Sequence, residues 1–144
     1  KIIEVVSKMN LNNFIIERIC KPLGIQDMGF VLSEEQKRRL VKLIEAKDGQ
    51  LNDVTEVESF WKLINPFDAG LYCGSAGMLG TVEGYAKIAN MLLNKGRVND
   101  QQFLKEETID KMSHETSEKH LEMQPGNVWG LGMCVTEDPE KAKR

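Results

Sequence analysis

A glycine-rich segment at residues 70–80 places the strongest local constraint on how this chain can fold. Four of its eleven residues are glycine: Gly70, Gly74, Gly77 and Gly80. Glycine adopts backbone angles that other residues avoid, so such a segment forms turns or allows close backbone contacts. Thr81 follows as a candidate N-cap, and apolar residues then recur at helical spacing as far as Gly96. The sequence therefore predicts a turn-rich segment leading directly into a helix that Gly96 ends in a left-handed conformation.

The inward face of this helix is predicted from its apolar residues, which are Tyr85, Ile88, Ala89, Leu92 and Leu93. Residues 1–21 show the same period twice, with a break near Asn10, and predict two short helices. A capping-box pattern from Ser33 to Gln36 predicts the start of another helix, which we expect to end near Ala46. The pair Asp48-Gly49 is a turn signal that can link two short strands.

The last third of the chain predicts a short helix at 106–112, a polar surface loop at 113–127 and a strand at 128–136. The charged tail, residues 137–144, is expected to fray. Together these patterns predict a mainly helical fold with a small β contribution of about one to three strands.

Composition excludes several classes of protein. The 144 residues are 41% hydrophobic with a net charge of -3, which fits a globular domain and gives no basic footprint for nucleic acid. No apolar run approaches the roughly 20 residues that cross a bilayer, so we expect no transmembrane segment in this chain. The chain begins at Lys1 inside a helical pattern, without a signal peptide. We therefore expect residues 1–144 to be one fragment of a larger domain.

The candidates for metal or cofactor chemistry are few. Cys20, Cys73 and Cys134 are far apart, form no zinc-type cluster, and are expected to be buried as small hydrophobic residues. His114 and His120 lie in the polar stretch and are expected to be solvated. We predict no metal site and no cofactor.

Two local motifs resemble catalytic signatures and are rejected. Residues 74–81 lack the spacing and the lysine of a phosphate-binding loop. Ser59 and Lys62 match the SxxK pattern of acyl-transfer enzymes by letters. Ser59 lies inside an amphipathic stretch, whereas that chemistry needs serine at a helix start with lysine one turn later. We therefore predict no catalytic residue within this chain.

Five segments in order resemble the serine β-lactamase-related hydrolases, which include class C β-lactamases, DD-peptidases and esterases. Residues 14–30 read FIIERICKPLGIQDMGF, and residues 77–87 read GMLGTVEGYAK. Residues 91–96, 104–112 and 129–133 continue the resemblance, which covers about residues 1–135. The chain departs from the usual family pattern at Gly80, at Gly84, and at Ser75-Ala76. The usual residues there are serine, aspartate and glycine, respectively.

The resemblance implies an antiparallel sheet with flanking helices, joined to a helical region. It also implies acyl transfer through a serine, a lysine and a tyrosine that lie outside this chain, with an oxyanion hole. In relatives the loop before the helix at 81 borders the substrate pocket. Tyr72 and Ser75 are therefore predicted to line that pocket in the intact protein.

The expected function is that of a central segment of a penicillin-recognising serine hydrolase, inert alone. Its substrate would be a small-molecule or peptide acyl compound: an amide, a lactam or an ester. The alternative is a non-catalytic helical binding module on the same scaffold, with an apolar patch where a partner docks. A patch exposed by truncation would also allow self-association. The sequence leaves the compartment open, although relatives are often exported.

Overall fold

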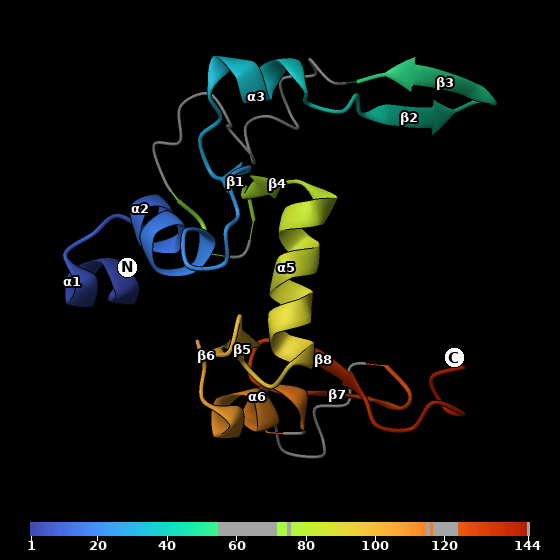
Figure 1. Cartoon of the computed structure of the whole chain (residues 1–144). Coiled ribbons are helices and arrows are strands. Elements are labelled where there is room, and N and C mark those ends of the chain that lie inside the picture. Colours follow the sequence, from blue (N-terminus) through green and yellow to red (C-terminus); the bar gives the residue numbers. More distant parts are fainter. Residues whose placement is uncertain (55–71, 75, 115, 117–123, 144) are drawn as a thin grey trace. The chain divides into compact units, whose positions relative to one another are not determined.

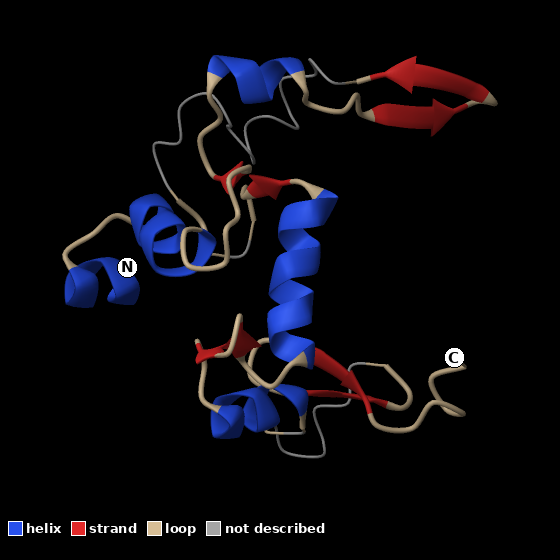
Figure 2. Ribbon diagram, in the orientation of Figure 1, coloured by secondary structure: helices blue, strands red, loops and turns tan. Residues whose placement is uncertain are grey.

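The computed structural model describes residues 1–54, 72–74, 76–114, 116 and 124–143. The chain divides into two compact units, residues 1–87 and residues 88–144. Helices and short strands alternate through both units (Figures 1 and 2).

The first unit opens with the two helices predicted for residues 1–21. They are α1 (Ile2–Ser7) and α2 (Leu11–Ile15), and α2 continues into a π-helical turn, η1 (Ile16–Cys20). The predicted break near Asn10 is confirmed, because its side-chain oxygen accepts a hydrogen bond from the Asn13 N–H at 2.8 Å. In η1 the Lys21 N–H donates to the carbonyl of Ile16, five residues earlier, at 2.9 Å.

A pair of short strands carries the chain from η1 to the glycine-rich segment. β1 (Met28–Gly29) pairs antiparallel with β4 (Leu79–Gly80), with Met28 opposite Gly80. The buried hydrophobic residues of this unit lie on or next to α2, η1 and β1: Leu11, Cys20, Leu23, Ile25 and Phe30. The core is thus built from the N-terminal elements, and the glycine-rich segment is joined to it through β4.

Between β1 and β4 the chain forms α3 (Glu34–Arg38) and a hairpin of β2 (Ile44–Lys47) and β3 (Gln50–Asp53). The capping box is confirmed, with Ser33 and Gln36 each bonding the other's main chain. The predicted turn is also confirmed, since Asp48 and Gly49 link the strands with φ of 51° and 75°. The expected helix as far as Ala46 is wrong, because the hairpin that this turn closes includes Ile44 and Ala46 in a strand.

α5 (Val82–Leu93) begins in the first unit and ends in the second. The predicted N-cap is confirmed, because the Thr81 hydroxyl accepts from the Gly84 N–H at 3.1 Å. The left-handed Gly96 is confirmed with φ of 82°, and Lys95 before it is also left-handed. The predicted inward face is partly wrong: Tyr85 and Leu93 are 70% and 82% exposed. Ala89 is exposed as well, and the buried positions of α5 are Gly84 and Met91.

The second unit contains two further hairpins and a helix. β5 (Arg97–Val98) pairs with β6 (Gln101–Gln102), α6 (Glu106–Ser113) follows, and β7 (Asn127–Trp129) pairs with β8 (Cys134–Thr136). The predicted helix at 106–112 is confirmed. The single strand expected at 128–136 is wrong, because the chain reverses between Gly130 and Met133, where Gly132 has φ of 77°.

Strands are more numerous than the one to three expected, because eight short ones lie in the described residues. All of them form two-stranded pairs. Residues 137–143, expected to fray, form turns in which the N–H groups of Glu137 and Asp138 donate to the Gly126 carbonyl at 3.0 and 3.1 Å. Within the described residues, no helix has the length and apolarity that crossing a membrane requires.

Candidate functional site

The site around the glycine-rich segment is organised by Phe30, which lies directly after β1. Its ring is 4% exposed and lies 5.4 Å from the Tyr72 ring, measured between centroids, with the planes tilted by 50°. The Asn12 side-chain oxygen accepts from the Phe30 N–H at 2.9 Å. A residue on α2 therefore fixes the backbone of Phe30, and Phe30 fixes the ring at the start of the glycine-rich segment.

A groove of about 440 Å³ lies between this segment and the N-terminal helices. Its wall on one side is Cys73, Gly74 and residues 76–78. The opposite wall comes mainly from α2 and η1, including Phe14, Ile15 and Ile19. Because nearly every lining side chain is apolar, the groove suits a hydrophobic group rather than a charged one.

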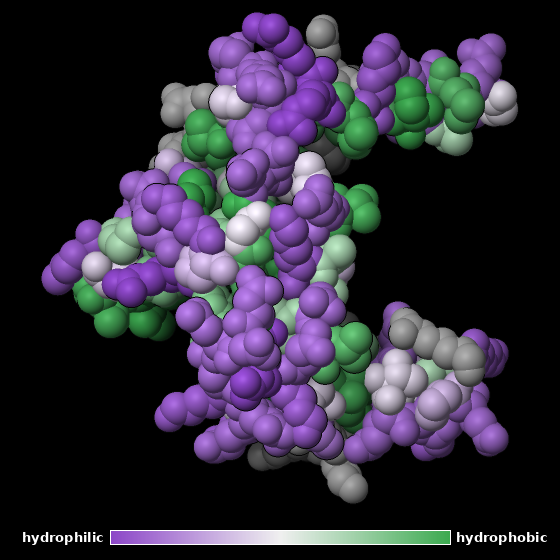
Figure 3. Space-filling view, in the orientation of Figure 1, coloured by the Kyte–Doolittle hydropathy of each residue, from purple (hydrophilic) through white to green (hydrophobic). Residues whose placement is uncertain are grey.

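The surface of α1 next to this groove is apolar as well. Ile3 lines the groove, and the neighbouring Ile2, Val5 and Val6 are 83%, 63% and 79% exposed. Figure 3 shows hydrophobic side chains gathered where α1 lies in Figure 1. No residue of α1 is buried, so this helix presents an apolar face that the described residues leave exposed.

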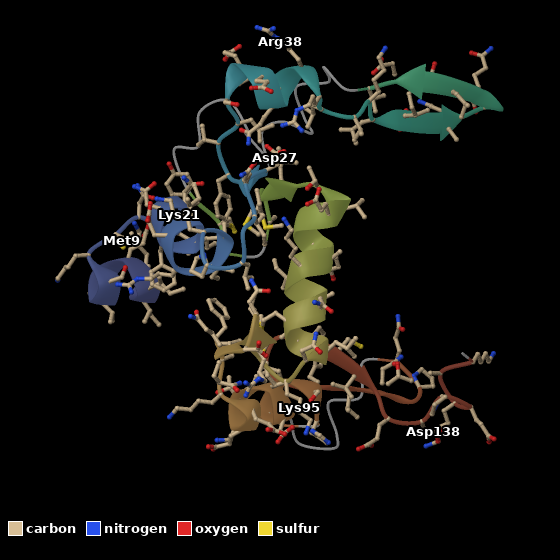
Figure 4. The ribbon with its side chains drawn as sticks, viewed as in Figure 1. Met9, Lys21, Asp27, Arg38, Lys95 and Asp138 are labelled. Atoms are coloured by element: carbon tan, nitrogen blue, oxygen red, sulfur yellow. The ribbon has the colours of Figure 1, made fainter. Side chains whose placement is uncertain are left out.

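Asp27 connects α3 to the β1–β4 pair. Its carboxylate accepts from Arg39 at 2.9 Å and from Gln36 at 3.1 Å, and its carbonyl accepts from the Thr81 N–H at 3.2 Å. Figure 4 shows Asp27 close to β1, below α3. The hydrogen bond from the Arg39 guanidinium, then that from Gln36, holds the pKa of Asp27 below its usual value. Asp27 thus anchors the end of α3 through its carboxylate and the start of α5 through its main-chain carbonyl.

A second, polar hollow of about 260 Å³ lies beside the first turns of α5. Lys87 lines it and donates to the Gly24 carbonyl at 2.8 Å. The same ammonium group lies 3.0 Å from the Glu83 carboxylate. Because its one ammonium group is already paired, we assign this hollow no ligand.

The two glycine departures from the family pattern have a packing reason. A Cβ at Gly84 would lie 3.0 Å from a methyl carbon of Ile25, and one at Gly80 would lie 2.9 Å from the Met28 methyl. Both distances are shorter than ordinary carbon contacts, so larger residues require these side chains to move. Local hydrogen bonding at the start of α5 is intact without the family's aspartate, because Thr81 caps Gly84.

Of the two predicted pocket residues, Tyr72 is half-buried, against Phe30 and next to Cys73 of the groove wall. Ser75 lies outside the described residues, as do Ser59, Lys62 and His120.

His114 is exposed, with its Nδ1 atom 2.8 Å from the Asp110 carbonyl. The expected burial of the cysteines is confirmed for Cys20 and wrong for Cys73 and Cys134, which are exposed.

Groups able to carry out nucleophilic or metal chemistry are not assembled in the described part of the chain. Its serines bond only within their own turns: Ser7 to Met9, Ser33 to Gln36, and Ser113 to the carbonyls of Ile109 and Asp110. In the same residues, no cluster of His, Cys, Asp and Glu has the arrangement of a metal site. The geometry supports binding of an apolar group and positioning of the glycine-rich segment.

Sequence reasoning missed Asn12, Phe14 and Phe30. Asn12 lies close to the predicted break between two helices, where asparagine is common, so its position in the sequence does not indicate its hydrogen bond with Phe30. The groove joins residues that are 43 to 75 positions apart in the chain, and no local pattern predicts that contact. Phe14 and Phe30 are apolar residues of a kind that is usually buried, so their identity indicates a place in the core but not a role in a site.

Comparison with known proteins identifies the family. The beta-lactamase family profile matches residues 1–142, and the chain belongs to this family. The resemblance drawn from the sequence is therefore confirmed, and the chain is a serine-hydrolase-related segment with a β-lactamase-like fold that mixes helices and short strands.

The chain also resembles a curated protein and several solved structures. Protein Rv1367c of Mycobacterium tuberculosis is 26% identical, with 92% of this chain and 34% of that protein covered. EstCE1, a hydrolase with promiscuous acyltransferase activity, has a TM-score of 0.79 and 23% identity over 99% of this chain and 39% of its own. Simvastatin synthase (LovD) from Aspergillus terreus has a TM-score of 0.70 and 24% identity, over 94% of this chain and 36% of its own.

A penicillin-binding protein homologue from Pyrococcus abyssi, described as octameric, has a TM-score of 0.65 and 22% identity. The match covers 92% of this chain and 27% of that one. At these identities the solved structures establish the fold alone. The chain spans about a third of the length of the curated relatives that it matches.

Proposed function

We propose that this chain is the central segment of a serine hydrolase that forms an acyl-enzyme with an amide, lactam or ester. In this proposal the segment supplies the helical region and one wall of the substrate pocket. The nucleophile and the base lie in the rest of the protein, so the 144 residues alone are inert. The observation that carries the proposal is the match of the beta-lactamase family profile to residues 1–142. The TM-score of 0.79 to EstCE1 over 99% of this chain supports the fold on which the proposal depends.

The arrangement around Tyr72 supports the role of pocket wall. Tyr72 and the glycine-rich segment are fixed from the N-terminal helices through Phe30 and Asn12. A fixed aromatic ring beside a turn-rich backbone suits a surface against which an acyl group or a leaving group is oriented. Ser75 is proposed to face the same pocket.

The inertness of the chain is tested by hydrolysis assays on the purified 144 residues. We expect no turnover of nitrocefin or of a p-nitrophenyl ester above the buffer rate, and no labelling by a fluorophosphonate probe. The matched control is Ser59→Ala, which removes the SxxK serine. Turnover that this substitution abolishes would show that catalysis resides in the chain.

The pocket-wall role is tested in a protein that contains these residues together with the remainder of a β-lactamase family domain. We expect Tyr72→Ala to raise KM several-fold while kcat changes less, because the ring orients substrate without taking part in bond making. Tyr85→Ala is a matched control, since that tyrosine is 70% exposed on α5. Equal effects of the two substitutions would remove Tyr72 from the pocket.

A further inference from the structure

The β2–β3 hairpin is a two-stranded sheet without cover in the described structure. All eight of its strand residues are exposed, and no other described strand pairs with it. Figure 1 shows the two strands side by side, extending beyond α3. Isolated two-stranded hairpins are marginally stable in water, and addition of strands stabilises them.

The register of the hairpin defines which edge of β2 is open. Lys47 faces Gln50 across the two-residue turn, which makes them a hydrogen-bonded pair. Bonding then alternates along the strand, and the Val54 N–H indeed donates to the Leu43 carbonyl at 2.8 Å. The intervening residues, Ile44 and Ala46, therefore direct their N–H and C=O groups away from β3.

The side chains divide between two faces. Ala46 faces Leu51 across the hairpin, and Leu51 is 78% exposed. Ile44 and Asp53 form the other pair on this face, which is called the apolar face because three of its four residues are apolar. Glu45 and Lys47 are both on the opposite face, where their cross-strand neighbours, Asn52 and Gln50, are uncharged. Within the described residues neither charge has an ion-pair partner. Figure 3 shows hydrophobic and hydrophilic side chains together on this hairpin.

We propose that the open edge of β2 pairs antiparallel with β2 of a second copy of this chain, giving a four-stranded sheet. Centred on Ala46, this two-fold arrangement lets the two Ala46 residues exchange both of their main-chain hydrogen bonds. Glu45 of each copy then lies opposite Lys47 of the other. On the apolar face, Leu51 and Ala46 of both copies form one continuous row across the sheet.

Charge selects this register over its neighbours. Sliding the partner in one direction places Glu45 opposite Glu45, and sliding it in the other places Lys47 opposite Lys47. Charged side chains on an edge strand ordinarily prevent pairing between chains. Only the register centred on Ala46 makes both charge contacts attractive, so it is the one in which this edge associates.

The proposed interface is small and belongs to the weak, transient class. We expect half-association at chain concentrations of roughly 0.1 to 1 mM. The test uses the full chain, with sedimentation equilibrium and NMR diffusion for its mass and amide chemical shifts for the location. We expect a monomer–dimer equilibrium, with concentration-dependent shifts centred on residues 44–48.

Charge-reversal variants provide the decisive comparison. Glu45→Lys and Lys47→Glu each place like charges opposite one another, so each should weaken association about tenfold or more. An equimolar mixture of the two variants should associate as well as the wild-type chain, because each variant complements the other. In each variant residues 45 and 47 carry the same charge, and mixing the two variants does not change this repulsion within a strand. Recovery of association in the mixture therefore reports the contact between chains. The control for Lys47→Glu is Lys105→Glu, which makes the same change in net charge at an exposed site of the second unit.

Several results would overturn the proposal. A wild-type chain that remains monomeric at 1 mM would do so, as would shifts centred on α1 instead of the hairpin. The proposal would also be overturned if each single variant associated as strongly as the wild-type chain. A mixture that fails to associate although circular dichroism shows both variants folded would overturn the proposed register and with it this interface.

Discussion

Gly96 is a residue whose replacement the backbone tolerates poorly. A Cβ there would overlap the Leu104 carbonyl, and the φ of 82° is unfavourable for any residue with a side chain. The Gly96 carbonyl also accepts from the N–H groups of Phe103 and Leu104 at 2.8 and 3.1 Å. The end of α5 and the approach to α6 are therefore joined through one glycine.

Replacing Gly96 by alanine should destabilise the chain by about 2–4 kcal/mol, because left-handed strain and a main-chain clash add together. Gly49→Ala is the matched control. Gly49 is also left-handed, with φ of 75°, but nothing lies within 4 Å of its Cβ position. Gly49→Ala should lower the free energy of unfolding by about 1 kcal/mol. Urea denaturation of both variants measures the difference, and equal costs would contradict the assignment of a clash at Gly96.

The cysteines should divide by reactivity. Cys20 is 2% exposed, and its burial raises the pKa of the thiol, whereas Cys73 and Cys134 are exposed. Thiolate is the reactive form, so Cys73 and Cys134 should react with a disulfide reagent in the native chain and Cys20 only after unfolding. Mass spectrometry of the labelled peptides measures this order. Labelling of Cys20 at the rate of the other two would be inconsistent with its burial.

Among the secondary-structure elements, α3 depends on a charged contact outside itself. Asp27 bonds Arg39 and Gln36 by its side chain and Thr81 by its main chain. One residue thus contacts the end of α3 through its carboxylate and the start of α5 through its main-chain carbonyl. The side-chain contact with Arg39 and Gln36 lowers the pKa of Asp27, which connects the packing of α3 to acid stability.

Asp27→Asn should reduce stability at neutral pH, and the stability of this variant should fall less than that of the wild-type chain as the pH is lowered. The folded pKa of Asp27 is lower than the unfolded value, so the contribution is present above about pH 4 and is lost as pH falls through the folded pKa. Thermal unfolding between pH 7 and pH 2 measures the profile. Arg39→Gln should flatten it similarly, and the double variant should add little. If Asp27→Asn loses as much thermal stability between pH 7 and pH 2 as the wild-type chain, this contact is not the cause of that loss.

Local signals predicted some elements, and tertiary contacts decided the others. The capping box at Ser33 and the turn at Asp48-Gly49 are complete within four residues, so the sequence predicted both. The buried side of α5 was mispredicted because apolar residues lie on more than one of its sides. Contact of Gly84 with Ile25, which is distant in the sequence, decides which side is buried. Gly130 and Gly132 lie within the single strand predicted for residues 128–136, but glycine permits the reversal that the chain makes there.

The candidate site likewise contains one residue that the sequence predicted and others that only tertiary contacts reveal. Tyr72 was found through the family resemblance, whereas Phe30 and Asn12 were not, because their role depends on contacts over 42 and 18 positions of sequence. Apolar periodicity indicates that a residue is buried but not which cavity it lines. The groove between α2 and the glycine-rich segment could therefore be recognised only in three dimensions.

Across the whole molecule, burial is concentrated in a few places. The buried hydrophobic residues of the described chain lie in residues 11–30, in α5 and in α6, and none lies in the β2–β3 hairpin. Stability is expected to vary correspondingly along the chain, because opening of a region exposes less apolar surface where little is buried.

Hydrogen exchange should reveal this distribution. At micromolar concentration we expect slow exchange for amides of α2, η1 and α6, and fast exchange for the hairpin amides. Exchange measured peptide by peptide with mass spectrometry tests the expectation. Hairpin amides as protected as those of α6 in dilute solution would show that the hairpin has a partner within its own chain.

The π-helical turn η1 has a consequence for how relatives of this chain can differ in length. Its hydrogen bond closes over five residues instead of four, so the turn accommodates one residue more than an α-helical turn. Glu17 and Arg18, which are exposed, are the positions from which one residue can be removed, after which the bond closes as in an α-helix. Residues on both sides then keep their places around Cys20. Family members that differ by a single insertion or deletion here can share one fold.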